Sequence, residues 1–218
     1  MFGESSVIEF MRKGGFFMYP ILLCSIVGLA IFLQKIWMLR VKRIIPEQFL
    51  NTLYGFLSQG KISEAIVLSR TNESSTARIA LAVLENSNKS KEELKEEIEA
   101  AGRKEAQELG RYIEGLGAIS NASTLLGLLG TISGMIKIFK VISEQTIVNP
   151  PSLAAGISEA LYTTAFGLLV AIPAFIAYKY ASGKAEGLIT DMEGEAKRIM
   201  EEVLFANERK DKTREIAR

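Results

Sequence analysis

The fold is decided by residues 115–136, GLGAISNASTLLGLLGTISGMI, which contain no charged side chain. A helix needs about 20 mostly apolar residues to cross the hydrocarbon core of a bilayer. A second uncharged run, ALYTTAFGLLVAIPAFIAY, covers residues 160–178, and residues 153–158 extend it backwards. A third, FFMYPILLCSIVGLAIFL, covers residues 16–33. We therefore predict an all-α membrane protein with three transmembrane helices.

The run at residues 16–33 has one rival interpretation, a secretory signal peptide. It is long for the apolar part of such a peptide, and no small-residue cleavage site follows it. Trp37 comes just after the run, where aromatic side chains favour the membrane–water interface. We therefore expect residues 16–38 to form the first span.

Composition excludes several function classes. Apolar residues make up 48% and charged residues 23% of the chain, the mean hydropathy is +0.19 and the net charge is +1, so no overall field favours nucleic acid. The chain has no histidine and one cysteine, Cys24, which excludes an internal disulfide and a Cys/His zinc site. We find no nucleophile–base set, metal cluster or phosphate loop. We expect no enzyme activity, metal or cofactor.

Positive charges predict the orientation. Lys and Arg follow the first and third spans and precede the second, whereas the loop at residues 143–152 has none. Because cytoplasmic loops are rich in Lys and Arg, we place the N-terminus and this loop outside and the C-terminus in the cytoplasm. The expected segments are 1–15 outside or interfacial, 16–38 first span, 39–112 cytoplasmic helical region, 113–142 second span, 143–152 periplasmic loop, 153–180 third span and 181–218 cytoplasmic helical tail.

The cytoplasmic segments carry helix signals. Residues 46–58 and 61–70 read as a helical hairpin broken at Gln59-Gly60. Ser90 and Glu93 form a capping-box pattern, and with no strong breaker before the second span, the helix that it starts is free to run on into the membrane. Residues 188–203 continue the third helix with an apolar face. The charged faces suit solvated surface, and the apolar faces need a partner, either each other or a neighbouring subunit.

Small residues form a stripe along the second span, comprising Ser123, Gly127, Gly130 and Gly134. Small residues let helix backbones approach closely and so promote association in lipid. Tight packing and pore lining both remain open, on different faces of the helix. In the third span, Pro173 frees the carbonyl of Leu169 and favours a packed kink or a hinge.

Polar residues of the two spans are expected at matching depths. With residues 143 and 153 level at the outer surface, Thr131 lies about 18 Å and Thr164 about 16.5 Å inward. These hydroxyls, with Thr163 beside them, either line a polar belt near mid-membrane or simply bond their own helix carbonyls. Lys137 and Glu159 share a depth of about 9 Å. We expect them to pair, or Glu159 to collect protons at an outer vestibule, because charges at such depth are usually functional.

No aspartate or histidine lies in any span. Threonine forms hydrogen bonds but does not titrate near neutral pH, so a proton path through this chain alone lacks a titratable group at the midplane. If the protein conducts protons, we expect a partner helix to supply the carboxylate.

Two segments resemble the MotA/TolQ/ExbB proton-channel family, most closely its ExbB and TolQ branches. Residues 127–134, GLLGTISG, resemble the motif of its second helix, and residues 156–174, GISEALYTTAFGLLVAIPA, resemble its third-helix signature with Gly167 and Pro173. Lys137 and Lys140 depart from the pattern, since uncharged polar residues are expected there.

The resemblance implies a homopentamer in the bacterial inner membrane, around a dimer of ExbD- or TolR-type single-span partners. An aspartate of the partner would carry the proton, with Thr131, Thr164 and Glu159 facing it. Such a motor would drive TonB- or TolA-type proteins in import or envelope maintenance. A structural membrane scaffold without conduction and a flagellar-stator-like MotA relative are the alternatives; stators normally have four spans.

Overall fold

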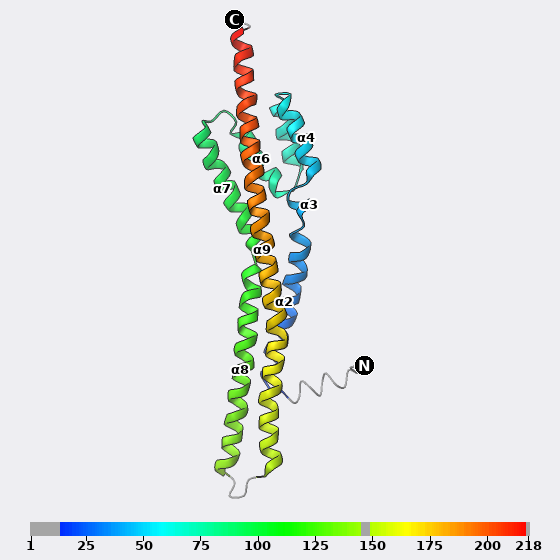
Figure 1. Ribbon diagram of the computed structural model, residues 1–218, viewed down its shortest axis with the longest axis vertical. Coiled ribbons are helices and arrows are strands. Elements are labelled where there is room, and N and C mark those ends of the chain that lie inside the picture. Colours follow the sequence, from blue (N-terminus) through cyan, green and yellow to red (C-terminus); the bar gives the residue numbers. More distant parts are fainter. Residues whose placement is uncertain (1–13, 145–148, 217–218) are drawn as a thin grey trace. The chain divides into compact units, whose positions relative to one another are not determined.

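The computed structural model describes residues 14–144 and 149–216, and among these residues it has helices and no strand. The helices, labelled in Figure 1, are α2 (Met18–Met38), α3 (Val41–Ile44), α4 (Glu47–Ser58), α5 (Ile62–Thr71), α6 (Ser75–Glu85), α7 (Lys91–Gly110), α8 (Ile113–Glu144) and α9 (Pro150–Ile216). Three stretches, containing α2, α8 and α9, are long and apolar enough to cross a membrane. The predicted all-α fold with three candidate spans is confirmed.

Parts of three predicted segments lie outside the described residues. These are residues 1–13 of the N-terminal segment 1–15, residues 145–148 of the loop 143–152 and the last two residues of the tail 181–218.

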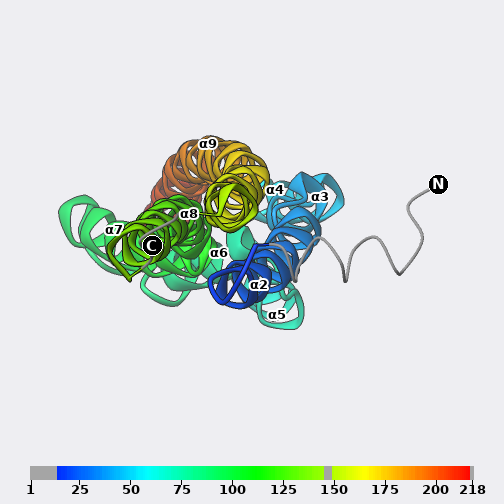
Figure 2. The ribbon, with the colours of Figure 1, turned by 90° about the horizontal axis from the view of Figure 1, so that it is seen from below.

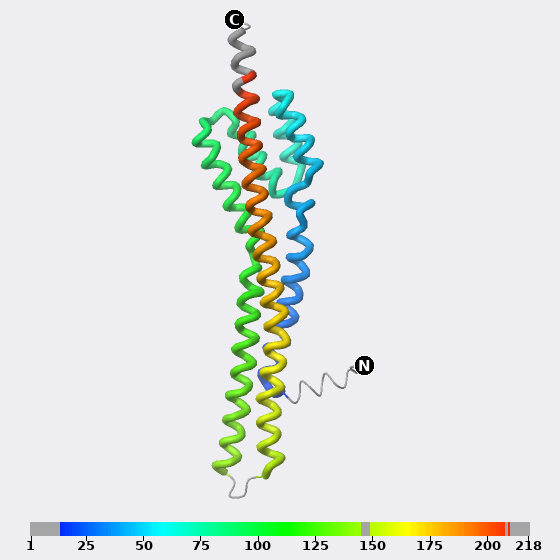
Figure 3. Tube along the Cα trace, in the orientation of Figure 1, coloured from blue at the N-terminus to red at the C-terminus, as the bar shows by residue number. Residues whose placement is uncertain are grey.

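The chain divides into two compact units that interleave along the sequence. We call residues 1–35 and 112–181 the span unit, and residues 36–111 and 182–218 the core unit. Helix α9 contributes its first part to the span unit and its last part to the core unit. In the tube of Figure 3, α9 is traced from yellow to red as one uninterrupted helix, which continues through Pro173.

In the span unit, α8 and the first part of α9 run antiparallel, and α2 packs beside both (Figures 1 and 2). A Cβ built on Gly28 of α2 would lie 3.3 Å from Cγ2 of Ile119 in α8, and one built on Gly115 of α8 would lie 3.5 Å from Cδ1 of Ile31. Large apolar side chains are exposed on all three helices, among them Leu23, Leu129 and Leu169. Such a surface suits lipid or a neighbouring helix rather than water.

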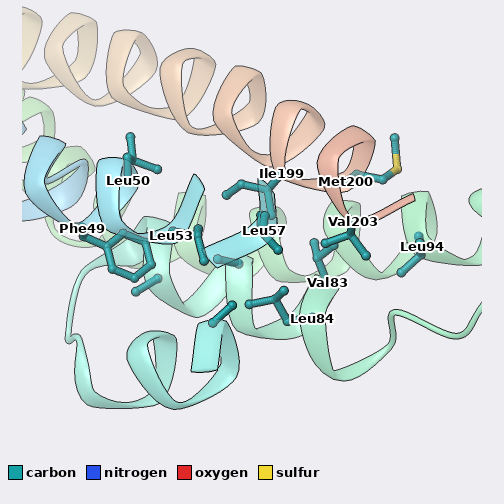
Figure 4. Packing of buried hydrophobic residues seen from close by; sticks show 13 residues of the cluster. Phe49, Leu50, Leu53, Leu57, Val83, Leu84, Leu94, Ile199, Met200 and Val203 are labelled. Atoms are coloured by element: carbon teal, nitrogen blue, oxygen red, sulfur yellow. The ribbon is translucent and has the colours of Figure 1, made fainter. Parts of the chain in front are cut away.

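The core unit has an apolar centre of its own, drawn in Figure 4. One face each of α4, α6 and α7 meets the last part of α9, so the predicted apolar faces are partners for each other within this unit. The cluster consists of Phe49, Leu50, Leu53, Leu57, Ala65, Ala77, Ala80, Val83, Leu84, Leu94, Ile199, Met200 and Val203.

Local signals at the helix ends explain most boundaries in this unit. The helical hairpin predicted at residues 46–58 and 61–70 is confirmed as α4 and α5. The predicted capping box is present, because Ser90 Oγ accepts from the Glu93 backbone N–H and the Glu93 carboxylate accepts from the Ser90 N–H. The Ser90 backbone N–H above all, and then the Ser90 hydroxyl, which also donates to the Glu93 carboxylate at 2.8 Å, lower the pKa of Glu93. Ser74 caps α6 through the Ala77 N–H at 3.2 Å.

A continuous helix from the capping box into the second span is wrong. Helix α7 ends at Gly110, and α8 begins at Ile113. Between them Tyr112 has φ +65°, a left-handed conformation that costs about 1–2 kcal/mol for a residue with a side chain. A tyrosine carries no sequence signal for such a break, which is why the pattern missed it.

Polar side-chain contacts also join helices inside the core unit. Arg78 of α6 donates from Nε to Glu105 Oε1 of α7 at 2.6 Å, and the Glu105 side chain is 4% exposed. That hydrogen bond raises the pKa of Arg78 despite partial burial, so the guanidinium stays charged. Tyr54 of α4 donates to Glu195 of α9 at 2.7 Å. Burial and then this bond raise the pKa of Tyr54.

We predict that Leu53→Ala lowers the free energy of unfolding by about 2–5 kcal/mol, because it leaves a cavity at a fully buried leucine. Val67→Ala on α5 is the control; that side chain is 62% exposed, and its truncation should change stability by no more than about 0.5 kcal/mol. Chemical denaturation of the purified full chain in detergent measures both. Equal effects of the two substitutions would contradict the position of this core.

Candidate functional site

The contact between α8 and α9 is made by residues without bulky side chains. A Cβ added to Gly130 would lie 2.3 Å from Cγ2 of Thr163, and one added to Gly134 would lie 2.8 Å from the Gly156 carbonyl oxygen. A Cβ on Gly127 would lie 3.4 Å from Cα of Gly167. The predicted packing residues of α8 therefore all face α9, and their backbones approach closely enough that larger residues would separate the helices.

Gly167 of α9 contributes to the same contact from the other side. A Cβ on Gly167 would lie 2.7 Å from the Ser123 carbonyl oxygen and 2.9 Å from Cα of Gly127. Pro173 lies two turns further along α9 and lines an apolar groove of about 470 Å³ together with Cys24, Gly28 and Phe32 of α2. The groove is open to lipid-like, apolar material.

Hydroxyl groups link the two helices. Ser120 donates to the Ala171 carbonyl at 2.9 Å, and Thr164 donates to the Gly127 carbonyl at 3.0 Å. Ser123 Oγ is fully buried and has no hydrogen-bond partner among the described residues. In an apolar surrounding such bonds hold helices together, and an unpaired hydroxyl is unfavourable.

The predicted depth match of Thr131 and Thr164 needs correction. Thr164 lies level with Gly127, to which it is bonded, whereas Thr131 is one helical turn further toward the loop. Thr131 donates to the carbonyl of Leu128 in its own helix at 2.6 Å. The two hydroxyls are thus offset along the helix pair. Each hydroxyl donates its one proton to a backbone carbonyl, and its oxygen can still accept hydrogen bonds.

Lys137 and Glu159 lie opposite each other near the loop end of the helix pair. Lys137 Nζ is 2.6 Å from Oε1 and 2.8 Å from Oε2 of Glu159. The lysine side chain is 56% exposed and the glutamate side chain 19%. The carboxylate is therefore the enclosed member of the pair.

A contact that the sequence did not indicate covers Glu159 and Thr163. The Gly14-Gly15 turn, just before α2, lies against them: Thr163 Oγ1 donates to the Gly14 carbonyl at 2.5 Å and to the Glu159 carbonyl at 2.8 Å. Thr163 is fully buried. Two successive glycines before an apolar run were the available sequence signal for this turn, but no sequence feature indicated which residues it would contact.

This contact also revises the depth estimates. It brings the start of the first apolar run beside Glu159, where the uncharged run of α9 begins, and beside Lys137, where that of α8 ends. The three uncharged runs therefore begin or end at about this level of the helix pair, nearer the ion pair than residues 143 and 153. Counted along α8 from Lys137, Thr131 lies about 9 Å from this level, and Gly127, to which Thr164 is bonded, lies about 15 Å from it.

The site offers hydroxyl groups for hydrogen bonding and one carboxylate, Glu159, near the loop end of the helix pair. Among the described residues, no group of three or more His, Cys, Asp or Glu side chains is placed to hold a metal. Glu159 is the one acidic residue in these parts of the helix pair, which lie between Glu114 and Glu144 in α8 and between Pro150 and Lys179 in α9. A hydroxyl can rotate from its helix carbonyl toward an incoming carboxyl group, so the threonines suit a titratable group delivered from outside the chain.

These features define a class of helical membrane protein with three candidate spans, in which two helices pack closely through small residues, hydroxyl-to-carbonyl bonds and one ion pair. Residues 62–194 match the MotA/TolQ/ExbB proton channel family, and the chain belongs to that family.

Relatives of known description extend the match over most of the chain. A putative biopolymer transport protein ExbB homolog of Methanothermobacter thermautotrophicus is 28% identical over 189 residues, which cover 86% of this chain and 67% of the relative. The putative biopolymer transport protein ExbB-like 1 of Synechocystis is 30% identical over 174 residues, covering 78% and 68%. The Tol-Pal system protein TolQ of Pseudomonas aeruginosa is 36% identical over 86 residues, covering 39% and 37%.

We predict that Gly134→Ala destabilises the span unit by about 1–3 kcal/mol, as overpacking does, because the new methyl group meets the backbone of α9. Gly115→Ala is the matched control on the same helix, since its Cβ would meet Ile31 at an ordinary 3.5 Å. Thermal unfolding of the purified full chain compares them. A Gly134→Ala protein as stable as Gly115→Ala would show that the close α8–α9 contact is not needed.

Proposed function

We propose that this chain is the channel-forming subunit of an ExbB/TolQ-type motor driven by the proton-motive force. It would sit in the bacterial inner membrane with its N-terminus outside and its C-terminus in the cytoplasm, and energise TonB- or TolA-type proteins that act on outer-membrane import or envelope maintenance. The observation that carries the proposal is the α8–α9 surface, where Thr131 and Thr164 offer hydroxyl oxygens next to an enclosed Glu159.

In this proposal the threonines do not carry the proton themselves. Thr131 and Thr164 hydrogen-bond to a carboxyl group that passes them, and Thr163 holds the segment around Glu159 in place. Glu159, paired with Lys137, collects protons at the outer end. This assignment is supported by the lack of any other acidic residue along the spans, because a neutral hydroxyl cannot replace a titratable group.

The missing titratable group is the aspartate of an ExbD/TolR-like single-span partner, present as a dimer inside a homopentamer of this chain. An aspartate that moves between protonated and ionised states can exchange hydrogen-bond roles with a threonine hydroxyl. Each proton that crosses would release about 2.3 kcal/mol per 100 mV of membrane potential. That energy would be used to turn the partner inside the ring.

A structural scaffold is the second candidate, favoured by the number of polar contacts that merely tie α8 to α9. Ser120 bonds Ala171 and Thr164 bonds Gly127, and a scaffold needs no more than that. The two candidates differ in what happens when a hydroxyl is removed without a change of shape.

We predict that Thr131→Val and Thr164→Val each reduce proton flux roughly ten- to hundredfold, as loss of a hydrogen bond to a charged group would. Glu159→Gln should also lower the flux, because it removes the outer proton acceptor. Flux is measured in vesicles that contain the chain together with its single-span partner. Thr124→Val is the matched control, since Thr124 bonds the Ser120 carbonyl of its own helix at 3.1 Å. Flux and coupling unaffected in all three site variants would favour the scaffold.

Native mass spectrometry of the detergent-solubilised chain tests the assembly. Expressed with its genomic neighbour, the chain should appear as five copies with two copies of an aspartate-bearing single-span protein. A monomer or dimer without such a partner would argue against the motor.

A further inference from the structure

The Gly14-Gly15 turn lies against the Glu159 carboxylate. A Cβ built on Gly15 would lie 2.1 Å from Oε1 and 2.8 Å from Cδ of Glu159. Gly15 also has φ +72°, a conformation that residues with a side chain rarely adopt. The backbone at position 15 therefore favours glycine, and a side chain there would displace the Glu159 carboxylate from its present position.

The turn is anchored on both sides of this contact. The Gly14 carbonyl accepts the Thr163 hydroxyl at 2.5 Å, and the Gly15 carbonyl accepts the Met18 N–H at 3.3 Å, at the start of α2. Gly14, Met18 and Thr163 are buried. The turn is thus fixed to α9 by one bond and to the first span by another.

Together, the turn and Lys137 enclose the carboxylate. Lys137 holds both oxygens, at 2.6 and 2.8 Å, and remains 56% exposed, whereas Glu159 is 19% exposed. Movement of the lysine or of the turn would expose more of the Glu159 carboxylate, which is 19% exposed as it stands. The lysine is a flexible side chain, but the turn is backbone, so its movement shifts the start of α2 as well.

We propose that the Gly14-Gly15 turn is a cover on Glu159: it positions the carboxylate against Lys137 and sets how often that group opens to the outer side. This inference rests on the proposed function, because a cover matters for transport only if the group beneath it exchanges protons. The alternative is that the turn merely starts α2 and that Glu159 would be equally protected without it.

The test follows the covalent labelling of Glu159 by a water-soluble carbodiimide in the full chain with its partner, reconstituted in vesicles. Gly15→Ala cannot keep the present contact, so labelling of Glu159 should speed up. Gly28→Ala is the matched control, because it also adds a methyl group to the first span, 3.3 Å from Ile119 and away from the carboxylate. Its labelling rate should equal that of the unmodified protein.

A second variant loosens the turn without a clash. Thr163→Val keeps the shape of the side chain but removes the hydroxyl that binds Gly14, and labelling should rise about two- to tenfold, the effect of one net hydrogen bond. Thr124→Val removes a hydroxyl bonded to the Ser120 carbonyl and should leave the rate unchanged. Native mass spectrometry checks that each variant still assembles.

Faster labelling in Gly15→Ala and Thr163→Val, with both controls unchanged, supports the cover. Assembled Gly15→Ala and Thr163→Val proteins that label at the original rate overturn it. The labelling needs no proton flux, so the two proposals fail separately. Normal flux in Glu159→Gln would refute the proton-collecting role of Glu159, while the labelling would still report whether the turn covers it.

Discussion

The span unit depends on the close approach of two backbones, those of α8 and α9. Inside hydrocarbon, helices gain nothing from hiding apolar side chains from each other, because lipid is as apolar as they are. Association then comes from van der Waals contact and from hydrogen bonds between helices. Gly127 against Gly167, and Gly134 against the Gly156 carbonyl, bring the axes near enough for Ser120 and Thr164 to reach carbonyls of the facing helix. With bulkier residues there, both kinds of contact would be lost together.

That same contact gives the polar residues their chemical character. A hydroxyl that donates to a carbonyl has its proton paired, but its oxygen can still accept a hydrogen bond. It can therefore bind a carboxyl group weakly and reversibly. A built-in aspartate at this depth would be expensive to bury and would bind a counter-ion permanently. The α8–α9 pair carries hydroxyls along its length, and its single carboxylate, Glu159, lies near the loop end in an ion pair with Lys137. In the motor that we propose, the mobile charge is therefore left to the partner.

The sequence predicted what periodicity and composition can reveal. The uncharged runs gave the three candidate spans, and the Ser90–Glu93 pattern and the Gln59-Gly60 break gave helix boundaries in the core unit. Helix α6 went unpredicted because its apolar face carries no strong start signal beyond Ser74. The break between α7 and α8 at Tyr112 was not predicted because a tyrosine gives no sequence signal for a positive φ.

The site was harder to predict than the fold. Counting residues from the loop put Lys137 opposite Glu159, since a helix hairpin with a short connection has little freedom in register. The same count put Thr131 and Thr164 at one depth, whereas Thr131 lies one helical turn nearer the loop. A register error of one turn is invisible to a pattern of small residues, and the contact with Gly14-Gly15 joins segments that lie far apart in the chain.

The order in which the chain is synthesised gives the discontinuous core unit a further meaning. Its centre combines α4, α6 and α7 with Ile199, Met200 and Val203, which follow both later spans in the sequence. Because α4, α6 and α7 are synthesised first, one apolar face of these helices stays uncovered until α8 and α9 have been inserted into the bilayer. A hairpin inserted the wrong way round would leave α9 on the other side, and the waiting face would stay open. Proteins with such uncovered apolar faces are generally removed by chaperones and proteases, so we expect the discontinuous core to favour one topology.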